Sequence, residues 1–446
     1  MNKRILATVA ALGVAGVAAL TLAQQAVTLR VVGFEVSAAE RGTPLDQAYK
    51  KFLADSQRAI PGLTIQSLET PPDFDTQLLV DLAAGTGPDV WSQDASSLAR
   101  LVDSGNVLDM RRCQAVVPSL TLGRFFPSVL AIHRRADGAI YGLPNDFTPM
   151  MIYYNPEAFA RAKVAVPRAG WTWDNFLRTA QLMTIDKNGR NRLDANFDEN
   201  NVVQWGFRQR KFPFEWVYRL WQNGGDVLSP DGKTATGFLD SPASLEAIQF
   251  MADLVLKYKV APRPSTLDQL TQQLGFLDRF LRGDFAMFDR GHWELVGLLS
   301  NKEYKPGRIG VVAQPRKKNG ATVMYASGWV INKAVERDPR KLEAACRFVE
   351  RATNRVYQDT KAITGIAIAA NQVSAAAAIG TSKLPDVERA FFSAVPSARA
   401  PYGSRFASYP AVETILESMM DRILNGAAVE ATVKAAVAEI NREVSR

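Results

Sequence analysis

The sequence predicts an α/β protein with a largely parallel sheet and two lobes or domains. The first reason is that strand and helix patterns alternate over residues 27–91. The second is the length of 446 residues, which exceeds one typical core. The composition, 47% hydrophobic and 22% charged, is that of an ordinary globular protein.

The first elements follow from local composition. A β-branched run predicts a strand at 27–34, and shorter runs predict strands at 63–68 and 90–91. Helical patterns at 45–53 and 75–84 separate them, and a glycine at position 85 is well placed to end the second helix. This alternation of strands and helices is typical of a parallel sheet.

Later helices are predicted by their capping residues. Thr172 precedes a stretch with apolar residues at helical spacing. Ser241 and Asp338 each stand directly before a proline, which suits the first position of a helix. The tail at 411–444 is expected to be mostly helical. No Pro-rich or Ser-rich linker separates two domains, which fits a chain that crosses between lobes more than once.

Residues 1–23 predict a cleavable signal peptide. Lys3 and Arg4 precede an uncharged stretch, and small residues stand before Gln24. An uncleaved membrane anchor is the alternative, but the many Ala and Gly residues make the stretch weakly apolar. We therefore expect a periplasmic or extracellular protein. No cysteine lies near the cleavage point, so a lipid anchor is not expected.

The charge distribution bears on the partner, and the cysteines bear on a disulfide. The formal charge is +8, but Lys and Arg are spread along the chain, which does not favour a nucleic-acid partner. The two cysteines, Cys113 and Cys346, either form a disulfide or are buried thiols, and both alternatives stay open.

Signals of catalysis are weak. There are two histidines and no Gly-x-Ser-x-Gly motif, and a P-loop would need glycine where Val227 stands. Segment 186–200 is rich in oxygen ligands, but Glu199 and Trp205 stand where an EF-hand needs Gly and Glu. A solvated loop is favoured there and a calcium site is left open. We expect no cofactor, although an Asp/Glu pair of a glycoside hydrolase remains possible.

Tryptophans point to a sugar ligand. The chain has eight, and several stand beside Gly, Pro or polar residues. Indole rings stack on the C–H faces of sugars, while carboxylates and amides bind the hydroxyls. Burial in a core is the alternative for any single tryptophan, but we expect at least two to line a cleft.

Several sequence blocks resemble the family 1 extracellular solute-binding proteins of bacterial ABC importers, the group that contains maltose-binding protein. The blocks, in the family's order, are GTGPDVW at 85–91, LARLVDSGNVLDM at 98–110, DGAIYGLPND at 137–146, MIYYN at 151–155, GWTWDNFLRTAQLMT at 170–184, WQNGGDVLSPDGKT at 221–234, FLRGDFAMFDRGHW at 280–293 and SGWVINKAVERDPRKLEAACRFVE at 327–350. They span essentially the whole chain after residue 23.

The resemblance implies a two-lobed periplasmic-binding-protein fold. We expect mixed, mostly parallel sheets with helices on both faces, and a hinge through which the chain crosses between lobes. By analogy, lobe I comprises 24–110 plus 270–316 and lobe II comprises 111–269 plus 317–446. A monomer would capture a mono- or oligosaccharide between the lobes and deliver it, unchanged, to the transmembrane permease subunits. The alternatives are a glycerol-phosphate-type binding subunit and a secreted glycoside hydrolase.

The resemblance also supplies candidate ligand residues. Trp293 matches a stacking aromatic, and Asp94 matches a hydroxyl-binding acid, with a helix N-cap as its alternative role. Thr148 stands where the family has a carboxylate, which puts that contact in doubt. Arg290 would serve a phosphate ester. The full candidate set is Glu35, Trp91, Asp94, Asn145, Asp146, Phe214, Trp216, Arg290, Trp293 and Trp329.

Overall fold

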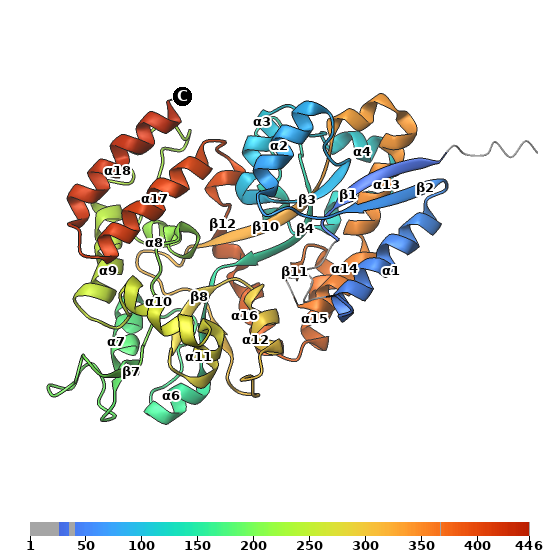
Figure 1. The fold of residues 1–446 in the computed structure, drawn as a ribbon. Coiled ribbons are helices and arrows are strands. Elements are labelled where there is room, and N and C mark those ends of the chain that lie inside the picture. The colour runs from blue at the N-terminus through green and yellow to red at the C-terminus, as the bar shows by residue number, and fades with distance from the viewer. Residues whose placement is uncertain (1–25, 35–40, 366, 446) are drawn as a thin grey trace, which may run out of the picture.

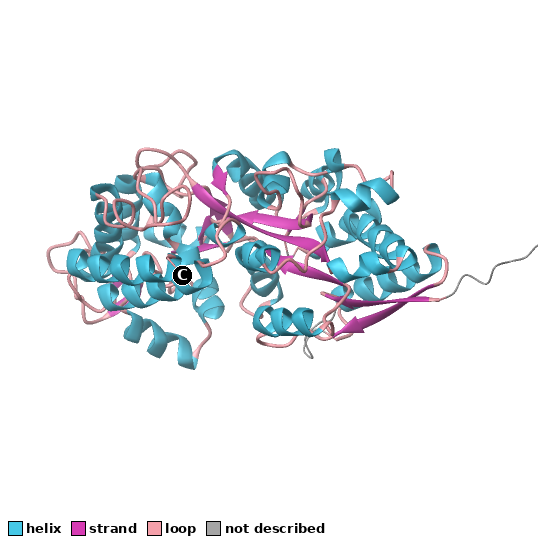
Figure 2. Ribbon diagram, turned by 90° about the horizontal axis from the view of Figure 1, so that it is seen from above, coloured by secondary structure: helices cyan, strands magenta, loops and turns pink. Residues whose placement is uncertain are grey.

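The computed structural model describes residues 26–34, 41–365 and 367–445, which form two lobes lying side by side (Figure 1, Figure 2). The expected two-lobed α/β architecture is thereby confirmed. The predicted signal peptide and Glu35 lie outside these ranges. Within them, no helix combines the length and apolar character that a membrane span requires.

The sheets are mixed. The strands are β1 (Val27–Val32), β2 (Leu63–Leu68), β3 (Val90–Asp94), β4 (Leu143–Pro149), β5 (Met151–Tyr154), β6 (Ile185–Asp186), β7 (Val202–Gln204), β8 (Met287–Arg290), β9 (Gly310–Val312), β10 (Thr322–Ile331), β11 (Ile368–Ala369) and β12 (Ala398–Arg399). The large sheet has the order β11-β4-β10-β3-β1-β2, with β12 also paired to β10; β8-β5-β9 form a second sheet, and β6-β7 form a two-stranded third. Parallel pairing joins β1 to β2 and β3, whereas β10 runs antiparallel to β3 and β4. The expected mostly parallel pairing is therefore found among the N-terminal strands β1, β2 and β3, whereas β4 pairs antiparallel with β10 and β11, and β5 pairs antiparallel with β8 and β9.

Helices surround the two larger sheets (Figure 1). They are α1 (Pro44–Ala59), α2 (Phe74–Ala84), α3 (Leu98–Asp103), α4 (Arg111–Val116), α5 (Pro127–Ile132), α6 (Pro156–Ala162), α7 (Trp173–Met183), α8 (Val217–Gln222), α9 (Pro242–Leu256), α10 (Pro264–Gln273), α11 (Phe276–Arg282), α12 (Glu294–Ser300), α13 (Pro339–Thr353), α14 (Arg355–Thr364), α15 (Gln372–Thr381), α16 (Pro385–Ala394), α17 (Tyr409–Leu424) and α18 (Val429–Val444). Short 3₁₀ turns include η2 (Ala95–Ser97), η4 (Pro213–Glu215) and η7 (Tyr402–Ser404).

The predicted caps are confirmed. Thr172 and Asn175 form a reciprocal capping box at the start of α7. Ser241 and Asp338 accept hydrogen bonds from backbone amides in the first turns of α9 and α13, each of which begins with proline. Gly85 ends α2 in the left-handed region with φ 75°, a conformation that glycine adopts without steric cost.

Core packing separates the two lobes. One hydrophobic cluster joins α7, α9, α17 and α18. Another surrounds β1 and includes α13. Segment 339–353, expected in lobe II, thus packs against a strand of lobe I, and β8, expected in lobe I, pairs with β5 of lobe II. The lobe boundaries remain a proposal, and this packing favours moving both segments to the opposite lobe.

Cys113 of α4 and Cys346 of α13 form a disulfide, with their Cα atoms 5.1 Å apart. Both cysteines are fully buried. The bond joins positions separated by 233 residues, so it closes a very long loop of the unfolded chain. Of the two alternatives that the sequence leaves open, the bonded one is present.

Removing this disulfide should lower the free energy of unfolding by about 2–5 kcal/mol, because the unfolded chain regains conformational freedom. The test is urea unfolding of the oxidised protein and of a Cys113→Ala/Cys346→Ala variant. Addition of dithiothreitol to the double variant is the control and should change nothing. Equal midpoints for the two proteins would contradict the prediction.

The oxygen-rich loop at 186–200 is organised around one buried carboxylate. Asp186 accepts hydrogen bonds from the backbone amides of Asn188 at 2.8 Å, Arg190 at 2.9 Å and Asp198 at 2.9 Å. These bonds occupy both carboxylate oxygens and account for the fold of the loop. Among the described residues, no group of three or more His, Cys, Asp or Glu side chains is placed to hold a metal ion.

Candidate functional site

Three polar residues meet where β3, β10 and β4 run side by side. Ser327 of β10 pairs in register with Asp94 of β3 on one side and with Asp146 of β4 on the other. All three side chains keep contact with solvent. The pairing of the strands therefore gathers residues that are up to 233 positions apart in the sequence into one polar row.

Asp94 acts as a helix N-cap, one of its two expected roles, and its position also leaves room for the other, binding of a ligand hydroxyl. Its carboxylate caps η2 by accepting a hydrogen bond from the Ser96 amide at 2.7 Å, and it remains exposed at the end of its strand. Desolvation by the surrounding protein raises the pKa of Asp94 more than the Ser96 hydrogen bonds lower it, and the charges of Asp146 and Asp75 add to the rise. The cap fixes the carboxylate while leaving it able to meet a ligand.

Asn145 and Asp146 lie on β4 in a dense hydrogen-bond network. Asn145 is 3% exposed and donates to Ser327 Oγ at 3.1 Å, so it holds the row in place. Asp146 accepts from Ser327 Oγ at 2.8 Å and forms an ion pair of 2.6 Å with Lys361 of α14. Asp146 thus presents a partly exposed, charge-compensated carboxylate beside Asp94.

Partly exposed aromatic rings lie near this row. Trp293, which precedes α12, stands with its ring centroid 6.2 Å from that of Tyr325 on β10. Phe214 in η4 lies 6.4 Å from the same tyrosine in an edge-on arrangement. Each of the three rings is only partly buried. The structure therefore brings Trp293 and Phe214 together around a third ring, Tyr325.

Three other candidate tryptophans are fully buried. Trp91 donates to Gln93 Oε1 at 2.9 Å, and Trp216 donates to the Lys211 carbonyl at 2.8 Å. Trp329 stacks on Phe34 with ring centroids 4.8 Å apart. Because these indoles have no surface left for a ligand, we do not carry them into the proposed site.

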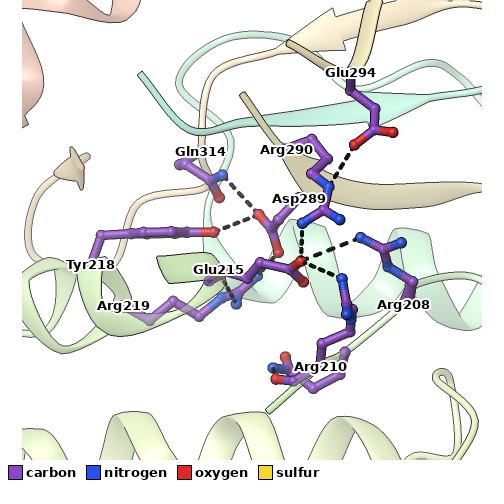
Figure 3. A network of polar contacts seen from close by, with 10 residues as sticks. Arg208, Arg210, Glu215, Tyr218, Arg219, Asp289, Arg290, Glu294 and Gln314 are labelled. Atoms are coloured by element: carbon purple, nitrogen blue, oxygen red, sulfur yellow. Dashed lines mark hydrogen bonds and ion pairs between the residues drawn. The ribbon is translucent and has the colours of Figure 1, made fainter. Parts of the chain in front are cut away.

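Arg290 belongs to an ion-pair network shown in Figure 3. It pairs with Glu215 and, at 2.6 Å, with Glu294. Glu215 is 2% exposed and also pairs with Arg210 at 3.0 Å and Arg208 at 3.5 Å. The guanidinium of Arg290 is thus already matched by two carboxylates.

The sequence reasoning missed Tyr325, Lys361 and Glu413 of α17. Tyr325 has a signal in the sequence: it lies two residues before Ser327, so strand alternation puts both on one face. Lys361 and Glu413 have no comparable signal, because each reaches the site by long-range packing of a helix. Desolvation, together with the charges of Asp94 and Glu417, raises the pKa of Glu413 to about 7.

Known proteins share this architecture. A protein from Listeria monocytogenes, described as an ABC substrate-binding protein in complex with cycloalternan, superimposes with a TM-score of 0.77 at 21% identity and covers 94% of this chain and 99% of its own. A maltose-bound protein named MalE3 from T. maritima gives a TM-score of 0.71 at 20% identity, covering 94% and 100%. These similarities show the fold.

A curated Escherichia coli protein, YcjN, whose name assigns it provisionally to the periplasmic-binding proteins of ABC transporters, is 22% identical over 306 residues. That match covers 68% of this chain and 65% of the relative, just under two thirds of its length. The family model described as "Bacterial extracellular solute-binding protein" matches residues 47–387. The match covers most of the chain and includes nearly all of the site described above, so the chain belongs to the bacterial extracellular solute-binding proteins.

Proposed function

We propose that this chain captures a sugar between its two lobes and delivers it to the permease of an ABC importer. One observation carries the proposal: the partly exposed rings of Trp293, Tyr325 and Phe214 lie beside the Asp94–Ser327–Asp146 row. Aromatic faces for C–H groups next to carboxylates for hydroxyls are what a sugar requires. Structurally similar proteins described as bound to cycloalternan, maltose and tagatose support the same ligand class.

The state of Arg290 argues against a glycerol-phosphate ligand. A phosphate would need an arginine with free donors, whereas Arg290 is engaged by Glu215 and Glu294. We further propose that the solute leaves unchanged, so that the protein acts as a carrier and not as a hydrolase. Incubation with each sugar that binds, followed by chromatography, tests this; a cleaved product would refute it.

Transport places further requirements on the chain. We propose that it is exported by the signal peptide at 1–23, works as a monomer outside the cytoplasm without a lipid anchor, and docks on permease transmembrane subunits. The proposed closure is a hinge motion, in which the solute stabilises the closed arrangement because it contacts both lobes only there.

A thermal-shift screen against a panel of mono- and oligosaccharides tests the sugar proposal. A sugar at one hundred times its Kd should stabilise the protein by about 2.7 kcal/mol. If no sugar in the panel shifted the melting temperature and the ligand found instead were an anion, the proposal would be wrong.

Replacing Trp293 with Ala should weaken binding of that sugar by roughly 30-fold, the effect of a loss of about 2 kcal/mol at a central aromatic contact. Calorimetric titration measures the change. Trp205→Ala, which removes another partly exposed tryptophan next to β7, is the matched control and should leave Kd unchanged. Equal affinities for the two variants would remove Trp293 from the site.

A further inference from the structure

A small cavity lies next to the polar row, at the junction of η2, β10, η7 and α17. Its volume is about 10 Å³, which is room for one water-sized group. The polar side chains that line it belong to Ser96, Tyr325, Tyr402, Tyr409 and Glu413. Ser96 is also the residue whose amide Asp94 caps, so the cavity adjoins that carboxylate.

The charge around this cavity is unbalanced. No ion pair to Asp94 or Glu413 is found in the described part of the chain. Lys211 pairs with two other carboxylates of α17, Glu417 at 3.2 Å and Asp421 at 3.8 Å. Partly buried Glu413, with the exposed carboxylate of Asp94 nearby, thus has no protein cation to compensate it, an arrangement that is costly unless something else supplies positive charge.

Tyr409 gives an independent indication that a polar ligand group belongs here. It is 5% exposed and lines the cavity, and no hydrogen bond to its hydroxyl is found within the described residues. Tyr402, by contrast, donates its hydroxyl to Asp226. The hydroxyl of Tyr409 is therefore open to a hydrogen-bond partner that enters the cavity from outside.

The carboxyl group in the lining favours a cation over a neutral hydroxyl. Glu413 lines the cavity together with Tyr325, Tyr402 and Tyr409, and an ionised carboxylate attracts positive charge. An ammonium group has nearly the size of a water molecule and offers three donors, which match the carboxylate of Glu413 and the tyrosine oxygens. A sugar hydroxyl would fit the space but would leave the negative charge uncompensated.

We propose that this cavity is a subsite for an ammonium group of the solute, so that the chain prefers an aminated sugar to the parent sugar. The inference rests on the proposed function, because the cavity adjoins the same aromatic rings and carboxylates.

The proposal implies a pH dependence with a definite sign. The groups that face or neighbour Glu413 are Asp94, Tyr325, Tyr402, Tyr409 and Glu417. With its pKa raised to about 7, Glu413 is mostly protonated at pH 5.5 and must ionise to pair with an ammonium group. Affinity for an aminated sugar should therefore rise up to about tenfold for each pH unit between 5.5 and 7, while affinity for the neutral parent should not rise.

Calorimetric titration of matched pairs tests the preference. The pairs are D-glucosamine and D-glucose, D-galactosamine and D-galactose, and a chitosan dimer and cellobiose, with N-acetyl-D-glucosamine as the uncharged amide. At pH 7 we expect at least one aminated member to bind about tenfold tighter than its parent. Neutral sugars that bind with no gain from the amine would overturn this inference alone. If none of these sugars and no sugar of the wider panel bound, the proposed function would be overturned as well.

Two variants locate the preference in this cavity. Glu413→Gln should abolish the preference for the amine and its pH dependence, so that the aminated sugar binds no tighter than its neutral parent. Glu439→Gln, which removes the charge of an exposed carboxylate on α18, is the control and should keep both. If Glu413→Gln does not fold, Tyr409→Phe should still reduce the preference. An unchanged preference in a folded Glu413→Gln protein would place the ammonium group elsewhere and refute the assignment.

Discussion

Replacing Glu215 with Gln should lower the free energy of unfolding by about 3–5 kcal/mol, the cost of leaving buried cations without their counter-charge. The carboxylate of Glu215 is 2% exposed and pairs with Arg208, Arg210 and Arg290 (Figure 3). Gln preserves the shape of the side chain but removes the negative charge. Arg208 suffers most, because it is 4% exposed and burial already lowers its pKa to about 9.

Urea unfolding at pH 7, with the slope of the transition checked for equality, measures this effect. The matched control is Glu417→Gln, which removes a half-exposed carboxylate from a surface ion pair and should cost about 0–1 kcal/mol. A loss below 1 kcal/mol for Glu215→Gln would show that the arginines are solvated without Glu215. Solute affinity should fall as well, because Glu215 follows Phe214 in η4 and pairs with Arg290 beside the site.

Elements with local signals could be predicted from the sequence. The strand at 63–68 matches β2, and the capping roles of Thr172, Ser241 and Asp338 are all present. These features depend on neighbouring residues, because a cap side chain bonds to amides within its own first turn. The family resemblance supplied the two-lobed architecture, which no local pattern contains.

Pairing between distant segments could not be predicted in this way. The bond between Cys113 and Cys346 and the return of β10 between β3 and β4 depend on the whole fold. The same limit applies to the lobe boundaries. The packing of 339–353 against β1 arises because its apolar face meets a strand three hundred residues earlier in the chain.

Burial explains which candidate site residues survive. Trp293 and Trp329 both stand next to glycine-containing segments, but Trp293 remains partly exposed whereas Trp329 lies under Phe34. Residue type alone does not separate them, because depth along a strand depends on what covers it. Arg290 illustrates the same point for charge, since Glu215, which neutralises it, lies 75 positions away.

Replacing Gly403 with Ala should weaken solute binding by at least tenfold, because it should prevent the lobes from closing. A Cβ atom at Gly403 would lie 1.6 Å from the carbonyl oxygen of Ser96 and 2.5 Å from its carbonyl carbon. Both are backbone atoms, so no side-chain rotation can relieve the overlap. Ser96 belongs to η2 after β3, and Gly403 belongs to η7 before α17, so the contact joins the two sides of the proposed cleft.

The overlap must be relieved by moving η2 and η7 apart, and the consequence depends on whether that contact exists only when the lobes close. If it does, as we propose, the variant folds with near-normal stability without solute, and X-ray scattering shows no decrease in its radius of gyration when sugar is added. Gly123→Ala is the control, because open space surrounds that position. Arg135, which donates to the Arg405 carbonyl at 3.2 Å and to Asp103 at 2.8 Å, spans the same junction, so Arg135→Ala should also weaken binding, but by less.

A Gly403→Ala protein that binds sugar normally would show that the two backbones separate freely, whereas one that melts early without solute would make the contact a permanent part of the fold. The two outcomes differ because a closure contact contributes free energy only to the solute-bound arrangement, while a permanent one contributes to both.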